Sequence, residues 1–157
     1  MLQKIISGGQ TGADRAALDF AIARGIPHGG WCPRGRLAED GALPARYHLS
    51  ETPDSDYAQR TEWNVRDSDA TVIFSIAPNL AGGSQQTADL AQRYAKRCLH
   101  LSRARDGRSS AAKLRQFLAT HDIKTLNVAG PRQSQAPDVA AFTTEVLEQA
   151  IPPRPVS

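Results

Sequence analysis

The sequence predicts an α/β fold, a three-layer, doubly wound, Rossmann-like and mostly parallel sheet. Three observations lead to this prediction. Short β-rich runs alternate with helical patterns along the chain. The run at 69–76, DATVIFSI, is nearly continuously apolar or β-branched, as strands are in a parallel sheet covered on both faces. Glycine-bearing loops follow three of the predicted strands, which is where ligands bind on such sheets.

The first elements form a strand, a glycine-rich turn and a helix. The strand covers residues 3–7 and the helix covers 13–24, with a face of small residues that would let it lie close to a sheet. A second strand is expected over 26–31. The polar stretch 32–44 that follows is interpreted as a functional loop.

The middle of the chain repeats this pattern around the buried strand at 69–76. Before it we expect a short strand over 47–49 and a helix over 54–66 with Asp54 as its N-cap. After it we expect a loop over 78–84 and a helix over 85–96.

The last third adds two more strands. They are expected over 98–101 and 124–129, with a helix over 111–120 between them. A loop over 130–137 leads to a final helix that begins near Val139.

Length and composition limit the number of domains and the class of protein. The 157 residues suffice for one domain, and we expect a single nucleotide- or cofactor-binding domain over 1–151 and a Pro-rich tail over 152–157. Two distant cysteines, and histidines without metal-ligand spacing, predict neither disulfides nor a structural metal. No signal peptide or long apolar run is found, so we expect a cytoplasmic protein without membrane contact.

The charge pattern gives no indication of a nucleic-acid-binding surface and is compatible with a phosphate-bearing ligand. The net charge is +3, carried by 15 Arg and 4 Lys, and the 16 acidic residues are scattered without leaving a basic stripe. We therefore expect no nucleic-acid partner. Arginine favours bidentate contacts with oxyanions, which is compatible with a phosphate-bearing ligand.

The first glycine loop is a variant of a phosphate-binding motif. Ser7, Gly9 and Gly12 stand where the dinucleotide fingerprint GxGxxG has its three glycines. Glycine would let the backbone approach a phosphate at the helix N-terminus, although a tight turn also needs glycine for steric reasons alone. We expect Gly9→Val to abolish ligand binding and Gly12→Val to push the first helix away from the first strand.

Two motifs are missing, and each absence argues against an activity. Segment 29–36 lacks the acidic residue that would bind the ribose of NAD, which argues against a dehydrogenase. No Gly-Lys-Ser/Thr occurs, which argues against a Walker-type ATPase.

Two further loops end strands with polar residues. Paired glycines precede a helix start at 82–83, and a Gly-Pro turn with an arginine follows the last strand. We expect all three loops to open on one edge of the sheet and form one anion-binding crevice. The candidates in these two loops are Gly82, Gly83, Ser84, Thr87, Asn127, Gly130, Arg132 and Ser134.

Five segments carry a resemblance to a known family. They are GGQTGADRAALDFA (8–21), GGWCPRGRLAEDG (29–41), RTEWNVRDSDATVIF (60–74), GGSQQT (82–87) and LNVAGPRQS (126–134). The chain resembles the molybdenum carrier family, which is similar to the lysine-decarboxylase-like, LONELY GUY-type Rossmann superfamily. The resemblance implies a cytosolic protein that binds a nucleotide or nucleotide-derived ligand, with molybdenum cofactor (molybdopterin) as a candidate. It also implies a homodimer or homotetramer.

The resemblance extends the set of candidate ligand-binding residues. From the first loop it adds Gly8, Gly9, Gln10, Thr11 and Gly12. The loop at 29–41 contributes Arg34 and Arg36, and Cys32 is the one thiol that could contact a bound molybdenum cofactor.

The sequence departs from the LONELY GUY-type hydrolases, whose second loop reads PGGxGTxxE. Without a gap, Asp89 falls where the glutamate belongs, and alignment on Thr87 puts Leu90 there instead. The missing glutamate counts against phosphoribohydrolase activity, because hydrolysis of a glycosidic bond needs a carboxylate.

Three functions therefore stay open, and the last of them is a structural module that assembles through exposed alanine faces. The first is a binding protein for a phosphate-bearing small molecule. The alternative is a nucleotide N-glycosidic hydrolase, for which the candidate catalytic residues are Glu62, Asp89, Arg34 and Asp14. Glu39 and Asp40 are further acids beside the arginines of the 32–44 loop.

Overall fold

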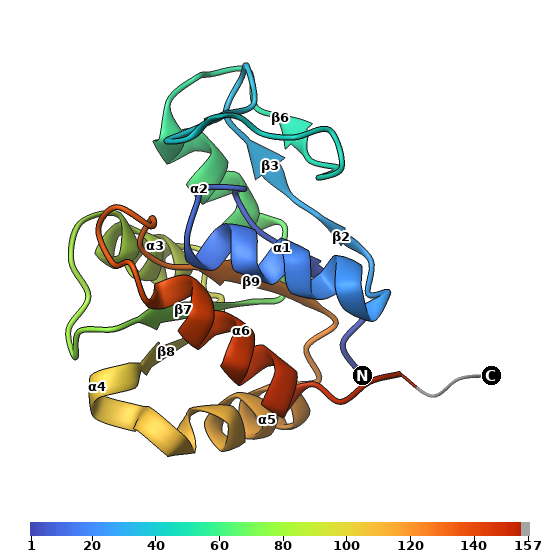
Figure 1. The fold of residues 1–157 in the computed structure, drawn as a ribbon, viewed down its shortest axis with the longest axis vertical. Helices are drawn as coiled ribbons and strands as arrows, with labels where there is room; N and C mark the ends of the chain where they lie inside the picture. Colours follow the sequence, from blue (N-terminus) through green and yellow to red (C-terminus); the bar gives the residue numbers. More distant parts are fainter. Residues whose placement is uncertain (155–157) are drawn as a thin grey trace.

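The computed structural model describes residues 1–154 and confirms the predicted three-layer α/β fold (Figure 1). A five-stranded parallel sheet in the order β2-β1-β9-β7-β8 forms its centre. Its strands are β1 (Lys4–Ile6), β2 (His28–Gly29), β7 (Ala70–Ser75), β8 (Arg97–Ser102) and β9 (Thr125–Ala129). The last strand, β9, lies between β1 and β7, so the winding direction reverses there.

Helices cover both faces of this sheet (Figure 1). On one face α1 (Ala13–Arg24), α5 (Ser110–Thr120) and α6 (Val139–Ala150) pack on one another and on the strands. On the other face α2 (Tyr57–Arg66) contacts α3 (Gly82–Arg93), and α3 contacts β7 and β8. Short segments α4 (Arg103–Asp106) and η1 (Gly107–Ser109), which the sequence does not predict, lead into α5.

The two faces of the sheet differ in polarity. Under α1, α5 and α6, side chains such as Val72, Phe74 and Val128 form the main hydrophobic core. On the opposite face the neighbouring strand positions include Thr71 and Asn127, and the Asn127 amide donates to the Thr71 hydroxyl at 3.1 Å. Because the side chains of a strand alternate, the polar face lies under α2 and α3.

The predicted strand 26–31 is wrong in one respect, because two strands occupy this stretch. Gly30 has φ +121° and turns the chain out of the main sheet. The second strand, β3 (Trp31–Cys32), pairs in parallel with β6 (Ser50–Glu51), which lies just after the strand expected at 47–49. The stretch 32–44 contains a hairpin of β4 (Leu37–Ala38) and β5 (Gly41–Ala42).

Two helix starts also differ from expectation. The N-cap of α2 is Asp56, whose carboxylate accepts the Ala58 N–H at 3.0 Å, and not Asp54. Helix α3 begins at Gly82, three residues earlier than expected, so the glycine pair forms its first turn. Within residues 1–154, no helix is long and apolar enough to span a membrane, and the tail residues 155–157 lie outside the described residues.

Candidate functional site

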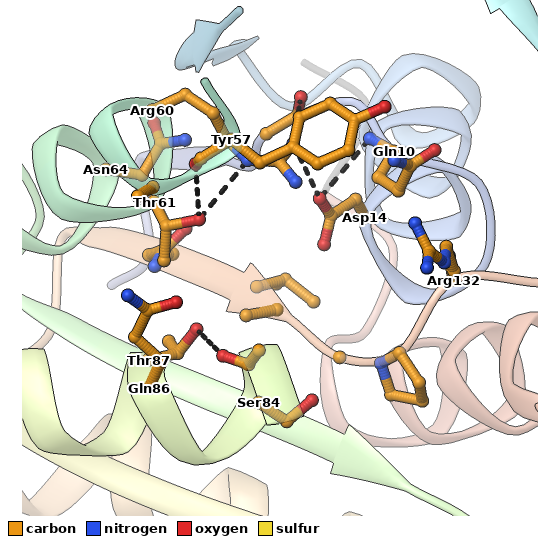
Figure 2. A pocket seen from close by; sticks show the side chains of 18 of the residues that line it. Gln10, Asp14, Tyr57, Arg60, Thr61, Asn64, Ser84, Gln86, Thr87 and Arg132 are labelled. Atoms are coloured by element: carbon orange, nitrogen blue, oxygen red, sulfur yellow. Dashed lines mark hydrogen bonds and ion pairs between the residues drawn. The ribbon is translucent and has the colours of Figure 1, made fainter. Parts of the chain in front are cut away.

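A polar cavity of about 210 Å³ lies at the carboxyl end of β9, between the segments that follow its neighbours β1 and β7, where the winding reverses (Figure 2). Its walls come from the loop after β1, from α2, from the first turns of α3 and from the loop after β9. Its polar lining consists of Gln10, Asp14, Tyr57, Arg60, Thr61, Asn64, Ser84, Gln86, Thr87, Asn127, Arg132 and Gln135. This is the type of site that binds a polar, hydrogen-bonding ligand.

The cavity brings together residues from all three glycine-bearing loops. Of the predicted ligand-binding residues it contains Gly8, Gln10, Gly83, Ser84, Thr87, Asn127, Gly130 and Arg132. Of the candidate acids it contains Asp14. Outside it, Glu62 accepts the Tyr94 hydroxyl at 2.8 Å and Asp89 accepts the Gln85 amide at 3.0 Å.

Arg60 is a site residue that sequence reasoning missed. It comes from α2, is only 8% exposed, and its Nη1 donates to the Gly8 carbonyl at 2.8 Å. A Cβ atom on Gly8 would lie 2.7 Å from Arg60 Cδ, so glycine is required here to accommodate an arginine. The four-residue spacing of Arg60 and Asn64, both buried, is the signal that could have indicated an inward-facing polar stripe on α2.

Asp14 occupies the N-terminal end of α1 with its own negative charge. Its Oδ2 accepts the Gln10 N–H at 3.3 Å and lies 3.6 Å from Arg60 Nη1. Burial raises the pKa of Asp14 to about 6, against the opposing effect of Arg60. The other carboxylate oxygen points into the cavity in Figure 2. An anion at this helix end would meet a like charge whenever Asp14 is ionised.

Gly9 was expected to face the ligand and Gly12 to face the first strand. Both glycines have other neighbours in the structure. A Cβ on Gly9 would lie 3.0 Å from Leu43 and 3.1 Å from Leu49, in a hydrophobic contact away from the cavity. A Cβ on Gly12 would lie 2.5 Å from the Pro131 carbonyl oxygen, in the loop after β9. Both residues have positive φ, of 78° and 83°, which favours glycine independently of any ligand.

The N-terminus of α3 faces the cavity without a cap. Ala81 at its N-cap position provides no side-chain hydrogen bond. A Cβ on Gly82 or on Gly83 would meet nothing within 4 Å, so the space in front of this helix end is open. Free N–H groups and the positive end of the helix dipole favour an anion there.

The arginines of the 32–44 loop lie outside the cavity. The Arg36 guanidinium donates to the carbonyls of Leu43, Pro44 and Tyr47, which gives it a structural role at the base of the hairpin. Arg34 is exposed. The remaining candidates, Thr11 and Ser134, both donate to Glu39 at the rim of the cavity.

The donors in the cavity suit an oxyanion better than a bare metal ion. Cys32 is 1% exposed and packs with Leu18, Leu43 and Tyr47 in a separate hydrophobic cluster. Within residues 1–154, no three His, Cys, Asp or Glu side chains are grouped so that they could hold a metal ion. Backbone N–H, guanidinium, hydroxyl and amide groups line the cavity instead.

Comparison with known proteins assigns the family. Residues 5–151 match the sequence profile of the circularly permutated YpsA SLOG family. The chain belongs to this family. The strand order of this family member is consistent with a permutation: if β9 and α6 preceded β1, the sheet order would read 3-2-1-4-5, as in the first five strands of the Rossmann order 3-2-1-4-5-6.

A solved structure extends the comparison. The chain is similar to the crystal structure, at 1.45 Å resolution, of a protein named putative molybdenum carrier protein from Syntrophus aciditrophicus SB. The two chains are 49% identical, the match covers 96% of each, and the TM-score is 0.94. No curated protein matches the sequence. The predicted resemblance to the molybdenum carrier family is confirmed.

Proposed function

We propose that this protein binds a phosphate-bearing small molecule in the cavity: a nucleotide, a nucleotide-derived ligand or the molybdenum cofactor. The observation that carries the proposal is the uncapped N-terminus of α3, which opens into the same cavity as Arg60 and Arg132. Arg132 and the free helix end favour a negatively charged ligand, and Arg60 adds to this attraction when its partner Asp14 is protonated. The amides of Gln10 and Asn127 supply further hydrogen-bonding groups for the organic part, whereas both ends of the Asn64 amide bond to the Trp31 backbone.

The printed name of the structural neighbour supports a molybdenum-containing ligand. The residues of the cavity fit the oxygen atoms of such a ligand, through Arg132 and the N–H groups of Gly83 and Ser84. Neither cysteine lines the cavity, so this chain would offer no thiolate to the molybdenum itself. Molybdate and a pterin phosphate are both oxyanions that these donors can bind.

Thermal denaturation with a ligand panel tests the proposal. The panel contains purine nucleotides, a pterin phosphate, molybdate and inorganic phosphate. A ligand present at 100 times its Kd should stabilise the native state by about 2.7 kcal/mol. If none of these ligands raises the Tm, the proposal is wrong.

Three variants locate the binding site. Gly83→Val would put a side chain into the open space before α3, and Arg132→Gln would remove a cation from the cavity. Each should weaken binding by about tenfold or more, since a charge-assisted hydrogen bond is lost or blocked. Arg34→Gln is the matched control outside the cavity and should bind like the wild type.

A second candidate function is hydrolysis of a nucleotide N-glycosidic bond, and Asp14 is the observation that favours it. Asp14 is the one carboxylate among the described residues that line the cavity, and burial raises its pKa to about 6. A carboxyl group with this pKa can donate or accept a proton near neutral pH. Release of free base from nucleotides, lost in Asp14→Asn and kept in Glu62→Gln, would establish the activity.

A further inference from the structure

A second group of anion-binding donors lies at the rim of the cavity and is occupied by a side chain of the protein. The Glu39 carboxylate accepts hydrogen bonds from the Thr11 hydroxyl, from the Ser134 N–H at 3.1 Å and from the Ser134 hydroxyl at 2.6 Å. Arg132 Nε lies 3.7 Å from the same carboxylate. Four donors from the loops after β1 and β9 therefore surround one carboxylate.

Glu39 leaves the Nε–H of Arg132 without a hydrogen bond. The Arg132 Nε–H is buried and has no hydrogen-bond partner within residues 1–154, because 3.7 Å is too long for a hydrogen bond. Both oxygens of the planar carboxylate are already bonded to Thr11 and Ser134. A tetrahedral oxyanion has additional acceptor oxygens in other directions, so it could satisfy these donors and Arg132 together.

The hairpin that carries Glu39 is held in place by polar contacts. Residues 37–42 are all exposed or half-buried, and none belongs to a hydrophobic cluster. Besides the bonds of the carboxylate, the Glu39 N–H donates to the Gln10 side chain at 2.8 Å and Asp40 pairs with Arg15 at 3.0 Å. Because the hairpin buries little apolar surface, it can separate from the loops after β1 and β9 by exchanging these hydrogen bonds for hydrogen bonds to water.

The base of the hairpin is fixed. The Leu43 N–H donates to the Arg36 carbonyl at 2.7 Å and so closes the hairpin at its root. The Arg36 guanidinium holds the carbonyls of Pro44 and Tyr47 at 2.9 and 2.7 Å. The tip can therefore move as a unit while its base stays attached.

We propose that the Glu39 carboxylate occupies an oxyanion site, and that a phosphate group of the ligand displaces it and opens the β4–β5 hairpin. The inference rests on the proposed function, because Gln10 and Arg132 line the cavity. Hydrogen bonds from Ser134 and Thr11 lower the pKa of Glu39, so its negative charge competes with the ligand at neutral pH. The charged group next to the Glu39 carboxylate is Arg132, and the neighbouring Asp40 is paired with Arg15 of α1.

Removal of the competing charge tests this inference. Inorganic phosphate is titrated by calorimetry into the wild type, Glu39→Gln and Glu39→Ala, each shown by its thermal melt to be folded. Phosphate affinity should rise by about tenfold or more in both variants, since an intramolecular anion no longer competes for the donors. Asp122→Asn is the matched control, because it removes one exposed carboxylate in the turn before β9, away from the hairpin and the four donors; it should show no gain.

Hydrogen exchange gives the second readout. Saturating phosphate should speed amide exchange in residues 37–42 of the wild type. Unchanged affinity in both Glu39 variants, or unchanged exchange in the phosphate-saturated wild type, would overturn the inference. If purine nucleotides still bind through Gly83 and Arg132 in that case, the proposed function survives. A gain of phosphate binding in the Glu39 variants, without nucleotide or molybdate binding to the wild type, would support the inference and refute the proposed ligand class.

Discussion

The buried pair of Asp14 and Arg60 shows how single residues build the cavity. Their side chains are about one-tenth exposed, at 9% and 10%, and both hold the backbone of the first glycine loop. The glycine loops could be predicted because their pattern is local. Arg60 could not, because its partner Gly8 lies 52 residues away and a helical arginine is ordinarily solvated.

Asp14 should make stability depend on pH. Its pKa is raised from 3.8 to about 6 in the folded protein. The stabilisation by protonated Asp14 is full below pH 4 and is lost as the pH rises through about 6, because the ionised form is then buried. This loss amounts to about 3 kcal/mol. Urea unfolding of wild type and Asp14→Asn between pH 4 and pH 7.5 measures it, and the variant should show the flatter profile.

Gly8 and Gly83 should respond oppositely to alanine. A Cβ on Gly8 would overlap the Arg60 side chain, whereas a Cβ on Gly83 would meet nothing within 4 Å. Gly8→Ala should lower the free energy of unfolding by about 1–3 kcal/mol, as overpacking does. Gly83→Ala, in the first turn of α3, should leave it unchanged or raise it by up to about 1 kcal/mol. Equal melting curves for the two variants would contradict this assignment.

At the scale of elements, α2 positions much of the cavity wall and depends on its N-cap. The glycine turn before α1 and the Pro-containing loop before α6 made the starts of both helices predictable, at Ala13 and near Val139. The point at which the chain leaves the main sheet, Gly30, was not predictable, because local propensity does not determine which sheet a short strand joins. The start of α3 was missed for a similar reason: glycine disfavours helices, yet Gly82 and Gly83 form its first turn.

Removal of the α2 cap should weaken the site without destroying the fold. Asp56→Ala removes the acceptor for the Ala58 N–H and should lower the free energy of unfolding by about 1 kcal/mol. Fraying would begin next to Tyr57, which lines the cavity, so ligand affinity should fall as well. Urea denaturation and ligand titration measure the two effects. Ser55→Ala, at an exposed neighbouring position, should change neither.

The whole molecule is organised around β9, the last strand in the sequence and the middle strand in the sheet. Strand β9 pairs with β1 and β7, which are far from it in the sequence. The strand order therefore could not be predicted from local patterns. The two ends of the described chain lie near each other, and Arg154 Nη2 is 3.4 Å from the Leu2 carbonyl oxygen (Figure 1). This proximity makes a second permutation feasible.

A permuted chain that begins at Asp122 should fold and bind ligand. A short Gly-Ser linker would join Ser157 to Met1, and the break before Asp122 falls in an exposed turn between α5 and β9, where new termini are tolerated. Every strand neighbour and every cavity residue is then retained, with β9 as the first strand. Circular dichroism should show a cooperative urea transition, and ligand affinity should stay within about threefold of the wild type, less than 1 kcal/mol.

A matched permutant opened between Pro78 and Asn79 would instead loosen the loop before α3; it should fold but bind more weakly. An Asp122 permutant that does not fold would contradict this prediction.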